Sequence, residues 1–282
     1  MKHLLSLILL LPMLCVAQPD RTAGSKLPSQ DELAVINDSI LQEGQWLYIY
    51  QKLSWMTSDL FAEHATVDLS SVDGSATQLD DNGNLTLFYY SQDSVMFSCT
   101  LDINDFSLSW DDTVRPMAED ERNAAHIRSS IFNHILETYG DSIYTIQDGL
   151  TCIDLICLDT NRIRVYLLTR TTLDGVIPFG NDCYVDIDID GNLIEFHRFH
   201  HSYIPIDIRQ TGDDTQAVEV IHSHTVDNPF FTPTDICTAL LYAHDLYGMK
   251  SVCILSTVFV PSAIMTFNMD DMSITVNEWE PL

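Results

Sequence analysis

The segment that decides the C-terminal fold is Val218-Glu219-Val220-Ile221-His222-Ser223-His224, which continues through residues 225–231 into Thr232-Pro233-Thr234-Asp235. Its first half is rich in β-branched residues and predicts a buried strand. Thr232 and Pro233 then offer an N-cap and a first helical residue, so a helix is expected over 233–247. A further apolar run predicts a strand at 251–260, and together these elements make a βαβ-like unit near the C-terminus.

Two histidines and a carboxylate of this segment are spaced as metal ligands. On a strand, His222 and His224 point to the same face and can chelate one ion. Asp235 falls in the first turn of the next helix, which can fold back onto the strand end. Two histidines plus one carboxylate, with an open fourth position, form a catalytic type of zinc shell. The competing interpretation needs no metal, because Thr232 and Asp235 are also good residues for capping a helix.

The pattern His222-x-His224-x7-Thr232-x2-Asp235 resembles the zinc signature of the JAMM (MPN+) metalloproteases, His-x-His-x7-Ser-x2-Asp. The resemblance covers about sixty residues, from Val218 to Asn277. It implies a zinc-dependent hydrolase of peptide or isopeptide bonds, with His222, His224 and Asp235 as ligands. Thr232 would stand where the family serine assists the developing oxyanion.

The motif is degenerate in three respects. Thr225 replaces the proline that usually follows the second histidine, the family serine is a threonine, and the segment 161–194 contains no glutamate to act as general base. Asp174, Asp182 and Glu195 are substitutes on distance along the chain alone. Hydrolysis needs a carboxylate that takes a proton from metal-bound water.

Two other polar groups resemble metal sites less closely. Residues 186–191, Asp-x-Asp-x-Asp-Gly, resemble the start of an EF-hand loop, but the twelfth position is His197 and not glutamate, so a hairpin with outward carboxylates is expected. Glu195, His197, His200 and His201 match no metal motif. On a strand, His200 would face away from Glu195 and His197, and the group is kept only as a neighbour of the His222 site.

The first 17 residues have the features of a signal peptide: Lys2, an apolar run too short to span a bilayer, and a small-residue cleavage site before Gln18. Ordinary export to the periplasm or the medium is favoured over lipid attachment at Cys15, because no small residue precedes this cysteine. Residues 18–29 are expected to form a flexible leader. No later stretch is apolar enough to span a membrane.

The chain has 13 Lys+Arg and 41 Asp+Glu, a net charge of −28. Such a field repels phosphate, which argues against a nucleic-acid partner. A protein or peptide partner remains open, and the spread of the acids along the chain favours solubility. The six cysteines after residue 17 lie mostly in apolar runs, which favours buried thiols over a disulfide framework.

The remaining pattern predicts an α+β protein with mixed and antiparallel sheets and one main helix in each half. Residues 30–115 should hold one long or broken helix, capped by Ser29 or Asp31, and a small antiparallel sheet, and residues 120–282 a C-terminal α+β domain. A second helix is expected from Asn123 to Tyr139, closed by Gly140, and a turn-rich loop over 173–182. The order of features resembles exported, uncharacterised bacterial proteins, a resemblance that implies no activity. We therefore expect an exported, acidic, soluble binding or non-enzymatic module with a candidate zinc site, and the JAMM-like hydrolase as the alternative.

Overall fold

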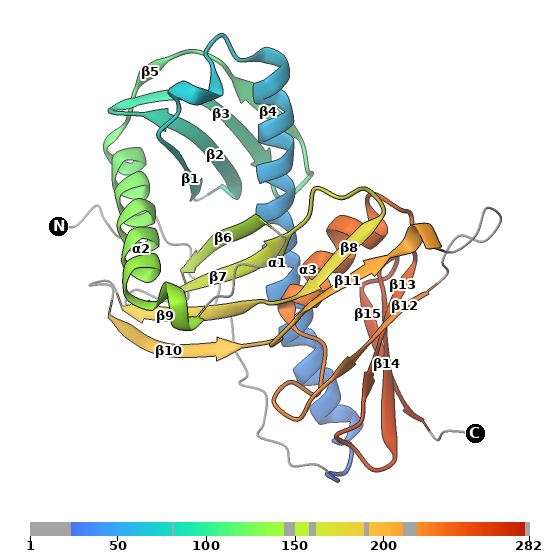
Figure 1. The fold of residues 1–282 in the computed structure, drawn as a ribbon. Coiled ribbons are helices and arrows are strands. Elements are labelled where there is room, and N and C mark those ends of the chain that lie inside the picture. The colour runs from blue at the N-terminus through green and yellow to red at the C-terminus, as the bar shows by residue number, and fades with distance from the viewer. Residues whose placement is uncertain are drawn as a thin grey trace.

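The computed structural model describes residues 24–80, 82–143, 150–157, 162–188, 192–210 and 219–279. The fold is α+β, as expected, and its sheets are antiparallel except where β12 and β13 run in parallel (Figure 1). The helical elements are α1 (Gln30–His64), η2 (Leu69–Ser71), α2 (Glu119–Ile143), η3 (Ile208–Gln210), α3 (Pro233–Thr238) and η4 (Ala239–His244). The strands are β1 (Gly74–Leu79), β2 (Asn84–Ser91), β3 (Ser94–Asp102), β4 (Leu108–Asp111), β5 (Arg115–Pro116), β6 (Leu150–Cys157), β7 (Arg162–Arg170), β8 (Val176–Gly180), β9 (Cys183–Asp188), β10 (Leu193–Arg198), β11 (Tyr203–Asp207), β12 (Glu219–His224), β13 (Ser251–Ser256), β14 (Ser262–Asn268) and β15 (Ser273–Trp279).

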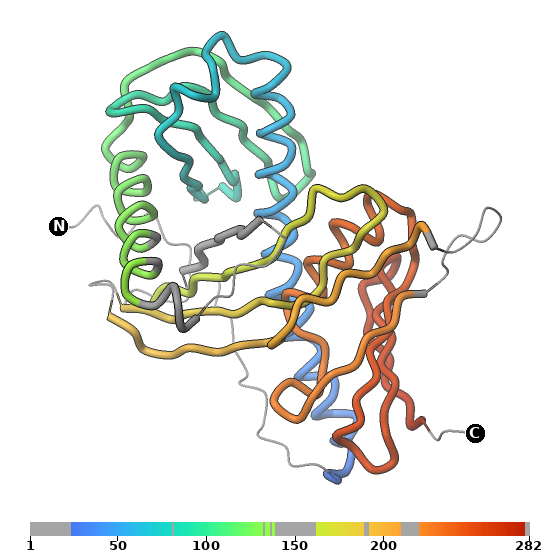
Figure 2. Tube along the Cα trace, viewed as in Figure 1, coloured from blue at the N-terminus to red at the C-terminus, as the bar shows by residue number. Residues whose placement is uncertain are grey.

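Helix α1 runs unbroken through the whole molecule (Figure 2). Its start is fixed by a capping box, in which the Ser29 hydroxyl accepts from the Glu32 backbone N–H and the Glu32 carboxylate accepts from the Ser29 backbone N–H. The first half of the helix packs on α3, η4 and the C-terminal sheet, and Leu53 in the second half packs on β2 and β3. Because one helix enters two cores, it fixes the N-terminal sheet relative to the C-terminal elements.

The N-terminal sheet has the strand order β1-β2-β3-β4, with β5 paired to β3. Alternate residues of β2 face opposite sides. Leu85 and Leu87 face α1, whereas Phe88 packs with Ala124 and Ala125 of α2. The two helices therefore cover the two faces of this sheet (Figure 1).

Helix α2 differs from the prediction at both ends. It begins at Glu119 and not after Asn123, and it continues through Gly140 to Ile143. Its first turn carries three acids, Glu119, Asp120 and Glu121, whose negative charges are favourable beside the exposed N–H groups of a helix start. The expected boundary between the two halves of the chain, at residues 115–120, therefore includes the start of a helix.

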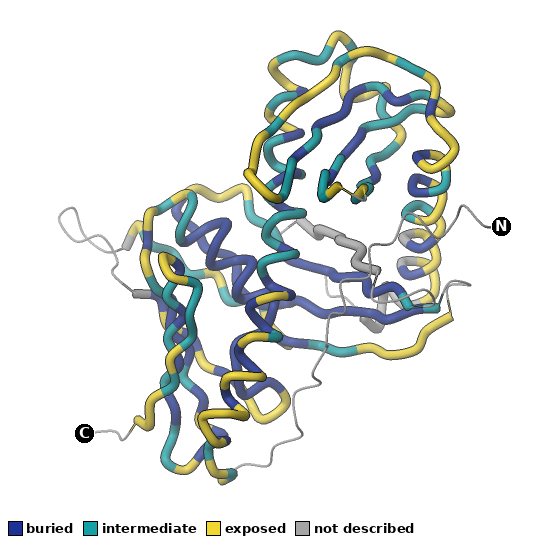
Figure 3. Tube along the Cα trace, turned by 180° about the vertical axis from the view of Figure 1, so that it is seen from behind, coloured by how far each residue is buried: buried dark blue, intermediate teal, exposed yellow. Residues whose placement is uncertain are grey.

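The central sheet has the order β10-β9-β7-β6 and is antiparallel. Ile131 and Ile135 of α2 cover one face of β7 and β9, and α1 lies on the other. Strands β7 and β9 are consequently buried, whereas β10 is an exposed edge (Figure 3). The hairpin between β9 and β10 is confirmed, but its predicted outward carboxylates are not both outward: Asp186 is fully buried and pairs with Arg164.

The expected loop over 173–182 contains strand β8, which pairs with β11. Gly180 ends this strand with a positive φ of 79°, and a Cβ at this position would lie 2.3 Å from the Ser202 carbonyl oxygen. Only glycine fits this close approach. The Asn181 N–H donates to the same oxygen, which holds the segment 199–202 against the end of β8.

The βαβ-like unit at the C-terminus is confirmed. Strand β12 pairs in parallel with β13, with His222 opposite Ile254 and His224 opposite Ser256. The connecting helix starts at Pro233, as expected, but changes from α-helical to π-helical hydrogen bonding at Ala239 and ends at His244. Strands β14 and β15 complete the sheet as an antiparallel hairpin.

Three further expectations concern the leader, the cysteines and the absence of a membrane span. Residues 24–29, expected as part of a leader, lie against the segment 258–260 through hydrogen bonds from Gly24 N to Val258 O and from Val260 N to Ser25 O. Residues 1–23 lie outside the described part. Four cysteines, Cys99, Cys183, Cys237 and Cys253, are buried and form no disulfide, which agrees with the prediction of buried thiols at these positions. Among the helices of the described segments, none is long and apolar enough to cross a membrane.

Candidate metal centre

Four buried side chains converge at the C-terminal end of β12. His222 and His224 come from the strand itself, Asp235 from the first turn of α3, and His200 from the segment that follows β10. The exposed fractions of His222, His224, Asp235 and His200 are 7%, 3%, 1% and 7%. One ligand atom from each lies within 4.8 Å of the other three. This group can therefore hold one metal ion, out of contact with bulk water.

Four of the six distances between these ligand atoms are close to the edges of a tetrahedron around a single ion. The Nε2 atom of His224 lies 2.9 Å from that of His222 and 3.3 Å from that of His200. Oδ1 of Asp235 lies 3.3 Å from His222 Nε2 and 3.6 Å from His200 Nε2. Zinc–ligand bonds of 2.0–2.1 Å give a tetrahedron with edges of about 3.3–3.4 Å. The observed separations bracket this value.

Hydrogen bonds from the Nδ1 atoms of His200 and His224, which point away from the cluster, leave the Nε2 atoms of both rings facing its centre. The Nδ1 atom of His200 donates to Oδ1 of Asp182 at 2.7 Å, and that of His224 donates to the carbonyl oxygen of Asn228 at 2.9 Å. A neutral imidazole with its proton on Nδ1 has a lone pair on Nε2. Two lone pairs thus face each other across 3.3 Å, an arrangement that repels unless a proton or a cation lies between them.

Asp235 adds negative charge to the same point. Its Oδ2 accepts hydrogen bonds from the backbone N–H and the hydroxyl of Thr232, but Oδ1 is buried and accepts none. An oxygen of a buried carboxylate without a donor is costly. Oδ1 lies closest to the Nε2 atoms of His222 and His200, so a cation at the centre would satisfy it.

The pKa values of these groups are shifted by their burial and by the charges of their neighbours. Burial alone would lower the pKa of His200, but the carboxylates of Asp182 and Asp235 outweigh it and raise that pKa to about 9. For His222 burial prevails, and its pKa is lowered in spite of Asp235. Burial tends to raise the pKa of Asp235, but the imidazoles around it hold that pKa well below the usual range. The carboxylate is therefore ionised, as a metal ligand must be.

A second layer of contacts places His200 beside β12. The Asp182 backbone carbonyl accepts from the N–H of Phe199, next to His200, while its side chain accepts from the His200 ring. Asn228, buried in the loop after β12, donates to the carbonyl oxygens of Arg198 and Phe199. These contacts join the end of β10 to the loop that follows β12. An outer carboxylate on a histidine ligand is typical of metal sites, because it sets the ring's tautomer and orientation.

Helix α3 brings Asp235 to the site through a capping box with Thr232, as the sequence predicted for a helix start. The position of α3 is set by a close crossing with α1. A Cβ on Gly44 would lie 2.5 Å from Cβ of Ile236, so α1 can approach this closely only at a glycine.

Most of the other candidate site residues proposed from the sequence lie outside the group of four ligands. The Thr232 hydroxyl is buried within the capping box. Asp182 contacts His200, whereas Asp174 is exposed, and Glu195 accepts hydrogen bonds from Arg162 and the Tyr184 hydroxyl. His197 faces Asn228 at 2.8 Å, and His201 is exposed. Of the four histidines and acids between 195 and 201, His200 alone joins the metal group.

The alternation expected for residues 195–201 does not predict His200 as a ligand, because it treats these residues as one strand. Strand β10 ends at Arg198, so the alternation of faces does not extend to His200. A sequence feature that points to His200 is the pair of turn-rich segments around 180–182 and 199–202. The pairing of β8 with β11 brings these two segments together.

No family model, curated protein or solved structure matches this chain.

Proposed function

We propose that this chain is an exported, acidic, non-enzymatic module in which a zinc ion, held by His200, His222, His224 and Asp235, joins two parts of the fold. The observation that carries the proposal is the set of four buried protein ligands, each with one ligand atom within 4.8 Å of the other three. Structural zinc sites have four protein ligands, whereas catalytic sites keep one position for water.

The donor set favours zinc. Three imidazole nitrogens and one carboxylate oxygen form a borderline set that suits zinc better than the hard ions calcium and magnesium, which take six or more oxygen ligands. Zinc imposes no electronic preference on geometry and accepts the tetrahedron that the four side chains present. It would also take the place of the proton between the facing imidazole nitrogens and supply positive charge beside the buried carboxylate.

The alternative is the JAMM-like hydrolase of peptide or isopeptide bonds. It rests on His222, His224 and Asp235, and it needs a water molecule as the fourth ligand. His200 occupies the place of that water. The Thr232 hydroxyl donates to Asp235, and the carboxylate of Asp182, a candidate base, is already engaged by His200. These contacts favour the structural role.

As a non-enzymatic module, the chain would act through a protein or peptide partner. The net charge of −28 favours partners with basic surfaces and disfavours nucleic acids and anionic membranes.

The decisive measurement is the metal content of the chain without residues 1–17, purified without a histidine tag, by elemental analysis. The test variant is His200→Ala. Its matched control is His201→Ala, which removes the exposed histidine next to it. We expect about one zinc per chain in the parent and in the control, a zinc affinity lowered by about tenfold or more in His200→Ala, and no peptidase activity.

Two outcomes would contradict the proposal. If the parent binds no zinc when zinc is offered at micromolar concentration, the site holds a proton and not a metal. If His200→Ala binds zinc as tightly as the parent while the His222→Ala/His224→Ala double variant binds none, the site has three ligands and an open position. Peptidase activity in the parent would then establish the hydrolase.

A further inference from the structure

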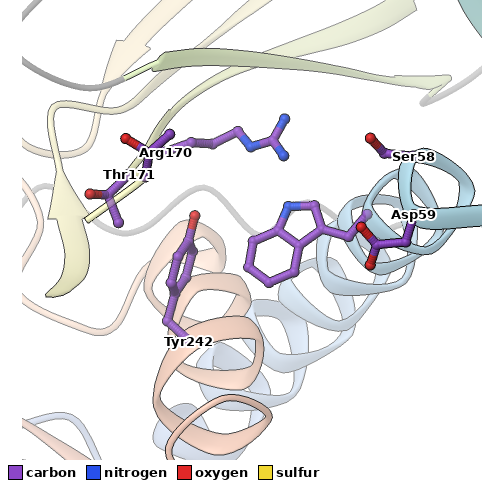
Figure 4. Close-up of a pocket in the computed structure, with 7 residues that line it drawn as sticks. Ser58, Asp59, Arg170, Thr171 and Tyr242 are labelled. Atoms are coloured by element: carbon purple, nitrogen blue, oxygen red, sulfur yellow. The ribbon is translucent and has the colours of Figure 1, made fainter. Parts of the chain in front are cut away.

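A pocket of about 260 Å³ lies beside the second half of α1, where three elements meet. Helix α1 contributes Trp55, Ser58 and Asp59, the end of β7 contributes Arg170 and the two threonines that follow it, and η4 contributes Tyr242. Figure 4 shows Arg170 reaching across the pocket towards Ser58, with the Tyr242 hydroxyl directed to the same space. None of the four candidate metal ligands lines this pocket, so its occupancy does not depend on zinc.

Arg170 is unusual in this acidic chain because its guanidinium pairs with no carboxylate of the described segments. The chain has only 13 Lys+Arg for 41 Asp+Glu, so carboxylates are abundant. Arg162 and Arg164, on the same strand, both pair with the buried Asp186. Among the side chains that the structure describes, no carboxylate lies within ion-pair distance of Arg170. Its guanidinium lies 6.0 Å from the centre of the Trp55 ring.

Trp55 supplies a second donor. Its Nε1 atom is buried and has no hydrogen-bond partner. An indole N–H can only donate, and so can a guanidinium, so both need an acceptor. A buried donor without an acceptor is destabilising, which makes the site one that a ligand with acceptor atoms would complete.

The walls of the pocket define the rest of the ligand. The rings of Trp55 and Tyr242 meet edge to face, with centroids 5.1 Å apart, and form an apolar corner. The Asp59 carboxylate at the pocket and the net charge of the chain disfavour a dianion such as phosphate. The volume of about 260 Å³ is just below the usual range for ligand sites, so the ligand is small.

We propose that this pocket binds a small organic carboxylate. The carboxylate oxygens accept from the Arg170 guanidinium and the Trp55 indole N–H, and the apolar body of the ligand lies against the rings of Trp55 and Tyr242. A carboxylate suits this pair of donors because its two oxygens can accept both at once, and hydrogen bonds between charged partners are stronger than neutral ones.

The test follows the indole N–H resonance of Trp55 in a ¹⁵N-labelled sample. The chain has four tryptophans, and the Trp55→Phe variant assigns the signal. The probes are sodium benzoate and benzamide, which have the same shape but differ in charge. We expect a saturable shift with benzoate and an affinity about tenfold or more lower for benzamide. Inorganic phosphate at equal concentration should not displace benzoate.

The arginine is tested with a pair of variants that change net charge equally. Arg170→Gln should weaken benzoate binding about tenfold or more, because it removes the charged donor. Lys250→Gln, at an exposed position, should leave it unchanged. The dispersion of the amide signals checks that each variant is folded.

Three results would overturn the proposal. They are the absence of a saturable shift with benzoate, equal binding of benzoate and benzamide, and displacement of benzoate by phosphate at equal concentration. All three use the unaltered protein, so they decide the question even if Arg170→Gln fails to fold.

Discussion

Replacing Gly44 by alanine sets two effects of known sign against each other. Gly44 lies in the middle of α1, where alanine is favoured over glycine by about 1 kcal/mol through helix propensity alone. The added methyl group, however, would lie 2.5 Å from Cβ and 2.7 Å from Cγ2 of Ile236, and 2.9 Å from the Pro233 carbonyl oxygen. Overpacking of this kind costs about 1–3 kcal/mol.

The clash should prevail. Two of the three contacted atoms, Cβ of Ile236 and the carbonyl oxygen of Pro233, move only with the backbone, so no rotamer change relieves them. The cost therefore belongs at the upper end of that range, and Gly44→Ala should lower the free energy of unfolding by about 1–2 kcal/mol. Because α3 must move and carries Asp235, zinc binding should weaken as well.

The assay is guanidinium denaturation of the zinc-loaded protein, compared at a constant m value. Ala34→Gly, at an exposed position of the same helix, measures the propensity effect alone and should cost about 1 kcal/mol without changing zinc affinity. If Gly44→Ala instead stabilised the protein by about 1 kcal/mol, α1 and α3 would not cross as closely as described, and the explanation for Gly44 would be wrong.

Three further predictions test individual carboxylates. Asp182→Asn should weaken zinc binding about 10–100-fold in a chelator competition, since a histidine ligand loses its charged acceptor, and an unchanged affinity would refute this role. Asp186→Asn should lower the free energy of unfolding by about 3–5 kcal/mol, because it leaves a buried arginine without its bidentate partner. Asp188→Asn on the same strand should cost about 0.5 kcal/mol or less, and equal effects in denaturant would contradict the argument. The hydrogen bonds from Arg115 hold the pKa of the Glu121 carboxyl below its usual value. The ion pair therefore stabilises the fold fully above a pH of about 4.5, and this stabilisation is lost as the pH falls through the lowered pKa. Glu121→Gln should therefore have a lower free energy of unfolding than the parent at pH 7, and this difference should shrink below a pH of about 4. A difference that persists at low pH would show that the charge of Glu121 is not its cause.

The parts of the fold that the sequence predicted are those set by neighbours in the chain. The capping boxes at Ser29 and Thr232 depend on residues three positions apart, and both helix starts were predicted. The hairpin of β9 and β10 depends on a turn between two alternating runs and was also predicted. In each case the interactions that fix the structure lie within a few residues.

The errors have a common physical origin in contacts between distant residues. Asp186 was expected to point outward because a hairpin usually has one solvated face, but α1 and α2 cover both faces of β7 and β9. Its side chain then lies towards α1, where Arg164 and Glu43 complete a buried ionic group. Alternation along a strand assigns a residue to a face, but it does not say what covers that face.

His200 shows how one distant contact changes the chemistry inferred from a local motif. His222, His224 and Asp235 belong to one strand–loop–helix unit, and a metal held by these three alone would keep a position for water. His200 is 22 residues before His222 and comes from a segment tied to the central sheet through Asp182. An ion bound by all four would join that segment to the C-terminal sheet, and it would lose its position for water by the same bond. The feature that makes the site a good structural link is therefore the feature that makes it a poor hydrolase, so an unchanged zinc affinity in His200→Ala and peptidase activity in the parent should be found together or not at all.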